Sequence, residues 1–186
     1  MPYTFIYSST SRWLQGLYNT SMYNHAPEGY ICPLCLTSKG IESEKTMAKQ
    51  ADVFYRDDLV FAMVNSKFVG NNPGHVIVVP NDHYENIYDI PLEVAHRIFD
   101  VAQKVALALK DIRRCDGVMT QQNNEPASGQ HAFHFHFHIF PRFDGDNFAE
   151  NINNVRLPLP EERAGYAADL RKYFEEMFPQ QGNTTS

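Results

Sequence analysis

The sequence has few cysteines and no long hydrophobic run. Three cysteines among 186 residues cannot pair completely, which argues against the disulfide framework of small secreted domains. No stretch approaches the roughly 20 apolar residues that a membrane-spanning helix needs. Residues 1–20 also lack a basic stretch followed by an apolar block, which is the pattern of a secretory signal. We therefore expect a cytoplasmic protein with no membrane partner.

Basic side chains are in the minority. Sixteen Lys and Arg stand against twenty-two Asp and Glu, which gives a net charge of −6. A chain of this charge has no overall field that attracts a nucleic acid polymer, although a local pocket can still bind a small anion. Hydrophobic residues make up 43% of the chain and charged residues 20%, a composition typical of globular proteins. The length predicts one core with modest extensions.

Several segments have the pattern of β-strands. Two β-type runs on either side of Asp57-Asp58 predict a hairpin, because this dipeptide is a turn signal. The Pro73-Gly74 break precedes a continuous β-branched run that predicts a buried strand. The predicted strands lie at 52–56, 59–65, 75–79, 117–122 and 133–140.

Two segments have the spacing of amphipathic helices. Apolar residues recur about every 3.6 positions over 91–112, and again over 166–178. Strands and helices therefore follow one another in the order strands, helix, strands, helix. This order predicts an α+β fold in which helices pack on an antiparallel sheet.

The most informative segment is the strand predicted at 133–140, where histidines alternate with apolar residues. His134, His136 and His138 would lie on one face of this strand. Chance would place three histidines at this spacing only ~0.01 times in a chain of this composition. A neutral imidazole is a nucleophile near pH 7 and also donates protons and binds metals. The cluster alone is compatible with either covalent catalysis or a metal site.

The segment His134–Arg142, with the sequence His-Phe-His-Phe-His-Ile-Phe-Pro-Arg, resembles the signature of the histidine triad (HIT) family. Pro73-Gly74-His75 and Gly129-Gln130 match two further motifs of the family, in the right order. The resemblance implies a HIT-like fold, with a long helix and a C-terminal helix on the sheet. We expect an N-terminal extension at 1–50, a catalytic domain at 51–145, and a C-terminal loop, helix and tail at 146–186.

The resemblance implies a nucleotide hydrolase or transferase that usually pairs as a homodimer. His136 would attack the α-phosphorus of a nucleoside phosphoramidate or dinucleoside polyphosphate and form a covalent nucleotidyl-histidine. His138 would bind a phosphate oxygen and assist the leaving group, with Gln130 and His75 as further catalytic and nucleotide-binding residues beside it. Asn65 stands where the family binds ribose hydroxyls.

A CxxC motif, Cys32-Pro-Leu-Cys35, indicates a second site. Two thiolates can chelate one metal ion, but a structural zinc needs four ligands. Some HIT-like proteins and the related galactose-1-phosphate uridylyltransferases supply the other two from positions that correspond to His83 and His134. The resemblance therefore implies a structural zinc bound by Cys32, Cys35, His83 and His134. A pair of reduced thiols and a redox-active CxxC are the alternatives.

The chain departs from the family pattern at Glu125, where a glycine is usual. A residue with a Cβ would oppose a positive φ there and reshape the phosphate loop. His25 is expected to be a surface residue. An alternative function from another class is a metal-binding or nucleotide-sensing module without turnover. In that case the three imidazoles would bind one metal ion, and substituting His136 would lower the metal content.

Overall fold

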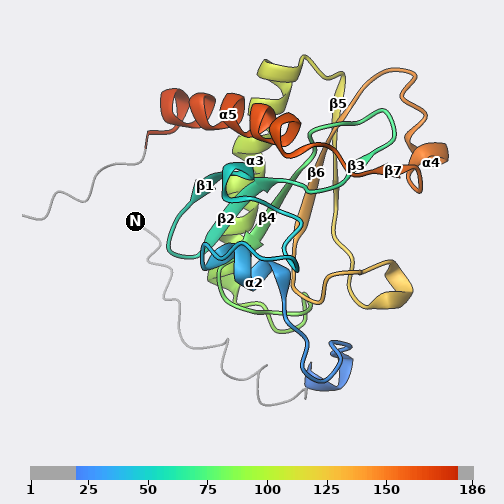
Figure 1. The fold of residues 1–186 in the computed structure, drawn as a ribbon. Coiled ribbons are helices and arrows are strands. Elements are labelled where there is room, and N and C mark those ends of the chain that lie inside the picture. Colours follow the sequence, from blue (N-terminus) through green and yellow to red (C-terminus); the bar gives the residue numbers. More distant parts are fainter. Residues whose placement is uncertain (1–19, 180–186) are drawn as a thin grey trace, which may run out of the picture.

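A five-stranded antiparallel sheet forms the centre of the molecule in this computed structural model, which describes residues 20–179 (Figure 1). Expectations for residues 1–19 and for the tail at 180–186 lie outside the described residues. The strand order is β1-β2-β4-β6-β5. These strands are β1 Val53–Arg56, β2 Val60–Val64, β4 Val76–Pro80, β5 Gly117–Gln121 and β6 Phe137–Arg142, and β3 Phe68–Val69 pairs separately with β7 Val155–Arg156.

Helices cover both faces of this sheet (Figure 1). The long helix α3, Leu92–Arg113, and the C-terminal helix α5, Pro160–Met177, pack on one face. The short helix α2, Pro33–Ser38, lies on the opposite face. The remaining elements are α4 Phe148–Asn151 and the 3-10 turns η1 Thr20–Tyr23, η2 Gln50–Asp52 and η3 Pro126–Ser128. The predicted α+β fold is confirmed.

The central strands β2 and β4 are apolar on both faces because both faces are covered. In β2, Val60, Ala62 and Val64 pack toward α3, whereas Phe61 and Met63 pack toward α2. All five side chains are fully or almost fully buried. This explains why the strand has a continuous apolar run rather than a strict alternation. Among residues 20–179, no helix is long and apolar enough to cross a membrane.

The predicted turns are present where the sequence signals them. Asp57 accepts hydrogen bonds on Oδ1 from the N–H groups of Leu59 and Val60, both at 2.8 Å, and so closes the β1–β2 hairpin. Gly74 has a φ of 76°, and a Cβ there would approach Arg113 Nη1 to 2.5 Å. Glycine favours this positive φ, and a side chain here would also have to displace Arg113 from the turn that leads to β4.

The prediction of one strand over 133–140 is wrong in its first half. Strand β6 begins only at Phe137, while residues 131–136 are irregular. The ladder between β4 and β6 ends at the pair Val78–Phe137, although β4 continues to Pro80 beside β2. The N–H of Phe135 instead donates to the carbonyl of Tyr84 at 2.6 Å. His134 therefore precedes the strand, but its ring still lies on the α2 side of the sheet, beside Cys32 and Cys35, while Phe135 and Phe137 pack in the opposite core.

The second predicted helix begins earlier than expected, at Pro160 rather than Tyr166. Proline at the first position and two acidic residues in the first turn are typical of a helix N-terminus. The polar residues of this added stretch do not follow the apolar spacing on which the prediction depended.

Candidate active site and metal centre

A pocket of about 500 Å³ lies between the histidine segment and the N-terminal part of the described chain. His136 and His138 line one part of it, and Asn65, at the end of β2, lines another. The lining described in the structure includes three histidines and two lysines, Lys45 and Lys67, but no carboxylate. This acidic protein therefore has a pocket that favours an anion.

His136 is held in one tautomer by the backbone. Its Nδ1 lies 2.7 Å from the carbonyl oxygen of His134. Because a carbonyl can only accept, Nδ1 donates its hydrogen, and the lone pair remains on Nε2. Burial is the main cause that lowers the pKa of His136 below its ordinary value. The ring is therefore neutral near pH 7 and able to act as a nucleophile.

His138 belongs to a stack of aromatic rings behind His136. The rings of His138 and Phe140 are stacked, with their centroids 5.5 Å apart. The ring of His75 is also stacked with that of Phe140, with a centroid distance of 4.3 Å. Burial, followed by the neighbouring His136, lowers the pKa of His75 to about 3. Burial also holds the pKa of His138 well below its ordinary value. Both rings are neutral near pH 7.

The other predicted nucleotide-site residues occupy different positions relative to the pocket. Asn65 lines it, with Nδ2 2.7 Å from His75 Nε2. His75 itself is only 1% exposed and lies behind the lining. Gln130 is 3% exposed and is not among the lining residues. Its Nε2 donates to the carbonyl of Glu85 at 2.8 Å, and its Oε1 accepts from the N–H of Glu125 at 2.6 Å.

The expectation that a Cβ would disallow a positive φ at Glu125 is wrong, because the residue adopts one. Glu125 has φ 66° and ψ 158°, a region that is almost exclusive to glycine. Its carboxylate accepts a hydrogen bond from Tyr88 Oη at 2.9 Å and lies 3.0 Å from Nε2 of His25. His25 is exposed, as expected, but its contact with this loop could not be predicted from a single surface histidine.

The four predicted metal ligands are brought together. The ligand atoms of Cys32, Cys35, His83 and His134 all lie within 4.8 Å of one another. Nδ1 of His134 is 3.4 Å from each sulfur, and Nδ1 of His83 is 3.3 Å from Cys35 Sγ. In a tetrahedral zinc site, sulfur and nitrogen ligands would be about 3.6 Å apart. The donor set and its spacing therefore fit a zinc ion.

Local structure orients this cluster. Cys32 is the N-cap of α2 and accepts the N–H of Cys35, so both thiols face the same side of the first turn. Nε2 of His134 lies 3.1 Å from the carbonyl of Pro80, which leaves Nδ1 for the sulfurs. Although burial opposes it, hydrogen bonds from His134 and His83 lower the pKa of the Cys32 thiol to about 5. A thiolate is the form that binds metal.

Comparison with known proteins agrees with this geometry. A model of the HIT domain matches residues 46–145. Protein hit of Bacillus subtilis is 36% identical over 115 residues, which cover 61% of this chain and 75% of that protein. The bis(5'-adenosyl)-triphosphatase of Dictyostelium discoideum is 31% identical over 136 residues, which cover 70% of this chain and 90% of that protein.

A solved structure shows the same fold. The crystal structure of a zinc-bound histidine triad family protein from Mycobacterium smegmatis matches with a TM-score of 0.62 and 25% identity, covering 78% of this chain and 96% of that one. The expected HIT-like fold is confirmed. Since the HIT model spans more than half of the 186 residues, this chain belongs to the histidine triad family.

Proposed function

We propose that the protein is a nucleotide hydrolase or nucleotidyltransferase that works through a covalent nucleotidyl-His136. The observation that carries this proposal is the 2.7 Å contact between His136 Nδ1 and the carbonyl of His134. This contact directs a neutral Nε2 lone pair away from the backbone. His136 itself lines the pocket, where a bound phosphate could meet that lone pair. A nucleophile of this kind divides one difficult displacement at phosphorus into two easier ones.

In the first step, His136 Nε2 forms a bond to the α-phosphorus as the bond to the leaving group breaks. The leaving group takes a proton from water. The ring then carries a positive charge, which the His134 carbonyl stabilises through Nδ1–H. Water or another acceptor next attacks phosphorus and breaks the phosphorus–nitrogen bond, which restores the neutral ring. The attacking group loses its proton to the hydroxide that the first step left. His138, being neutral, would contribute a hydrogen bond to a phosphate oxygen.

The pocket supports nucleoside phosphoramidates and dinucleoside polyphosphates as substrates. Its lysines and histidines favour the phosphates, and Asn65 lies where it could bind ribose hydroxyls. Ile31 and Met47 line the pocket and are 48% and 47% exposed, so they offer apolar surface for a base. The Dictyostelium relative is named as a hydrolase of a diadenosine compound, which supports adenine nucleotides as the first substrates to test.

We propose that Cys32, Cys35, His83 and His134 bind a structural zinc ion. Zinc bound there would hold α2 against the histidine segment and fix His134. The carbonyl of His134 is the group that orients His136, so the metal site and the nucleophile share one residue. Zinc has no chemical role in the proposed reaction.

We also propose that the enzyme is a homodimer, as the family resemblance implies. Strand β5 lies at the edge of the sheet, and Phe99 and Leu107 of α3 are exposed. Light scattering should give twice the mass of one chain. A mass equal to one chain would contradict this proposal without affecting the proposed chemistry.

The covalent intermediate provides the direct test of function. Wild-type protein is mixed with adenosine 5'-phosphoramidate or a diadenosine polyphosphate and the reaction is quenched in base. The mass of the intact protein is then measured by mass spectrometry. We expect an added mass of one adenylyl group that is absent in His136→Ala, with zinc content equal in both proteins. If no adduct forms and His136→Ala has lost metal, the protein is a binding module without turnover.

A further inference from the structure

One wall of the nucleotide pocket is formed by residues 45–48, which have no regular secondary structure. Met47 presents its side chain there, and Thr46 and Ala48 on either side are buried. Thr46 hydrogen-bonds Ser43 in both directions, with its Oγ1 donating to the Ser43 carbonyl and accepting the Ser43 N–H, each at 2.9 Å. These local bonds shape the loop but do not place it against the histidines. Ala48 packs in the apolar cluster with Phe61 and Met63 of β2, and a polar contact to a second rigid element holds the backbone at Met47.

That contact comes from the C-terminal helix α5. Arg163 is 2% exposed and donates from Nη2 to the carbonyl of Met47 at 3.1 Å. Its Nε donates to Asp52 Oδ2 at 3.0 Å, and its Nη1 donates to the carbonyl of Pro158 at 2.9 Å. The same Asp52 oxygen accepts the N–H of Lys49 at 2.8 Å. One guanidinium therefore joins α5 to the wall at Met47 and, through Asp52, to the N–H of Lys49, the residue that follows the wall.

The arrangement is suited to fixing a position. A guanidinium is planar and presents its donors in a rigid fork, so three acceptors in different directions define where it lies. Helix α5 is itself anchored in the core by the buried side chains of Ala167, Leu170 and Phe174. A buried ion pair adds little net stability, because desolvation offsets the attraction. The pair between Arg163 and Asp52 is therefore better explained by positioning than by stability alone.

We propose that Arg163 is a positioning residue for the nucleotide pocket and acts through the Met47 carbonyl and Asp52. This inference rests on the proposed function. It assigns a role in substrate binding to α5, which lies beyond the residues 46–145 that match the family model. Without Arg163, the wall would shift away from the bound nucleoside, while His136 and His138 would stay in place.

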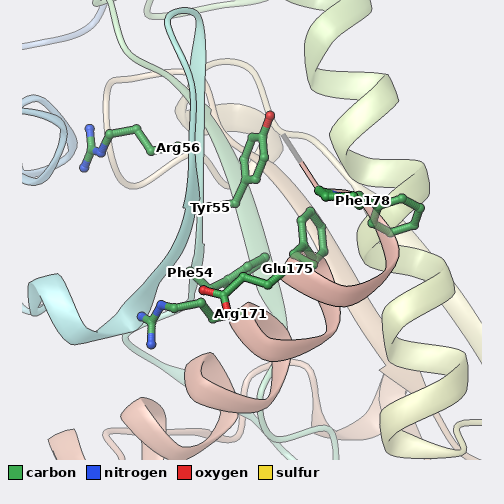
Figure 2. A pocket seen from close by; sticks show the side chains of 8 residues that line it. Phe54, Tyr55, Arg56, Arg171, Glu175 and Phe178 are labelled. Atoms are coloured by element: carbon green, nitrogen blue, oxygen red, sulfur yellow. The ribbon is translucent and has the colours of Figure 1, made fainter. Parts of the chain in front are cut away.

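The chain offers a matched control in Arg171, which follows Arg163 by two helical turns. Arg171 donates from Nη2 to the carbonyl of Val53 at 2.7 Å and to that of Ala51 at 3.4 Å. Figure 2 shows it beside Phe54 and Glu175, at a separate hollow of about 470 Å³ between β1 and the end of α5. Both arginines thus tie α5 to neighbouring backbone, but only Arg163 reaches a residue of the nucleotide pocket.

The test measures AMP affinity by titration calorimetry, together with the steady-state hydrolysis of adenosine 5'-phosphoramidate. The principal variant is Asp52→Asn/Arg163→Met, which removes both buried charges and keeps an oxygen to accept the Lys49 N–H. We expect its Kd for AMP and its KM to rise about tenfold, with kcat within about twofold of wild type. Arg171→Gln should keep the wild-type Kd.

Arg163→Lys provides a second variant that retains the charge but not the fork of donors. We expect an intermediate Kd, because one ammonium cannot reach the three acceptors together. A folded double variant with wild-type Kd and KM would overturn the inference, as would an equal loss in Arg171→Gln. If wild type neither binds AMP nor forms the adduct, the proposed function itself is overturned and the inference falls with it.

Discussion

His134 and His136 stand two residues apart, yet they lie in opposite kinds of environment. Both ring nitrogens of His134 have polar partners, two sulfurs and a carbonyl. The ring of His136 has one polar partner on Nδ1 and a T-shaped contact with His138. The chemistry of each imidazole is therefore set by what surrounds it and by the backbone path rather than by the motif alone.

The two environments are also connected. The residue whose ring faces the thiols is the one whose carbonyl holds the tautomer of His136. A change at the proposed metal site should thus reach the proposed nucleophile through one backbone group, while a change at the His136 ring should not reach the metal ligands. This asymmetry is what mutations can test.

The largest effect is expected from His136→Ala. Loss of the proposed nucleophile should lower kcat/KM for adenosine 5'-phosphoramidate by at least ~10⁴-fold, because the proposed covalent intermediate forms on this ring. Zinc content, measured by atomic emission, should be unchanged. If the variant loses both activity and zinc, His134 and His136 belong to a single metal site and the proposed nucleophile is wrong.

Removal of a metal ligand should give the next largest effect. Cys35→Ser is expected to reduce zinc from about one ion per chain to nearly none and to lower the unfolding free energy by roughly 3–5 kcal/mol. Activity should fall less than in His136→Ala, since the nucleophile remains. Cys115→Ser is the control, because this third cysteine is buried in the core away from the cluster. Equal zinc in Cys35→Ser and wild type would contradict the proposed site.

The sequence predicts most of the histidine segment, but the alternation alone does not predict the different surroundings of His134 and His136. The alternation from His134 to Phe140 is a correct signal for the core and for two of the three histidines. The predicted strand is too long at its start because the ladder between β4 and β6 ends at the pair Val78–Phe137, and which strand lies beside the histidines is not visible in a local pattern. The resemblance to a family, rather than the alternation, placed His134 among the thiols.

Gln130 illustrates a different limit of sequence analysis. Its match to the family motif correctly marks a residue of the loop near the pocket, but its amide is held by Glu85 and Glu125. The first of these partners is 45 residues away. Side-chain orientation depends on such tertiary contacts. Its catalytic role therefore stays a prediction.

The buried neutral ring of His75, which is stacked on Phe140 behind the pocket, should make the unfolding free energy depend on pH. Folded His75 binds a proton only near pH 3, whereas the unfolded residue does so below about 6.5. Between these values the unfolded state holds the extra proton. The stabilisation is therefore complete above pH 6.5 and is lost as the pH falls. Between pH 6.5 and 5, the unfolding free energy of His75→Phe should change less steeply with pH than that of wild type. The two slopes should differ by up to about 1.4 kcal/mol per pH unit.

Urea titrations of both proteins across this range measure that difference. Phenylalanine can keep the stack on Phe140 but cannot titrate, so the comparison isolates one proton. Parallel slopes would mean that His75 is protonated in the folded state, contrary to its burial.

The smallest effect concerns the loop that borders the catalytic end, where Glu125 adopts a glycine-like conformation. Both Glu125→Ala and Glu125→Gly remove the carboxylate contacts to Tyr88 and His25, but only alanine keeps a Cβ at φ 66°. Relief of that strain exceeds the entropy that glycine adds to the unfolded chain. Glu125→Gly should therefore melt about 3 °C above Glu125→Ala by differential scanning calorimetry. A higher Tm for alanine would mean that the loop relaxes to a negative φ, and Gln130 would then lose its bond to the residue 125 N–H.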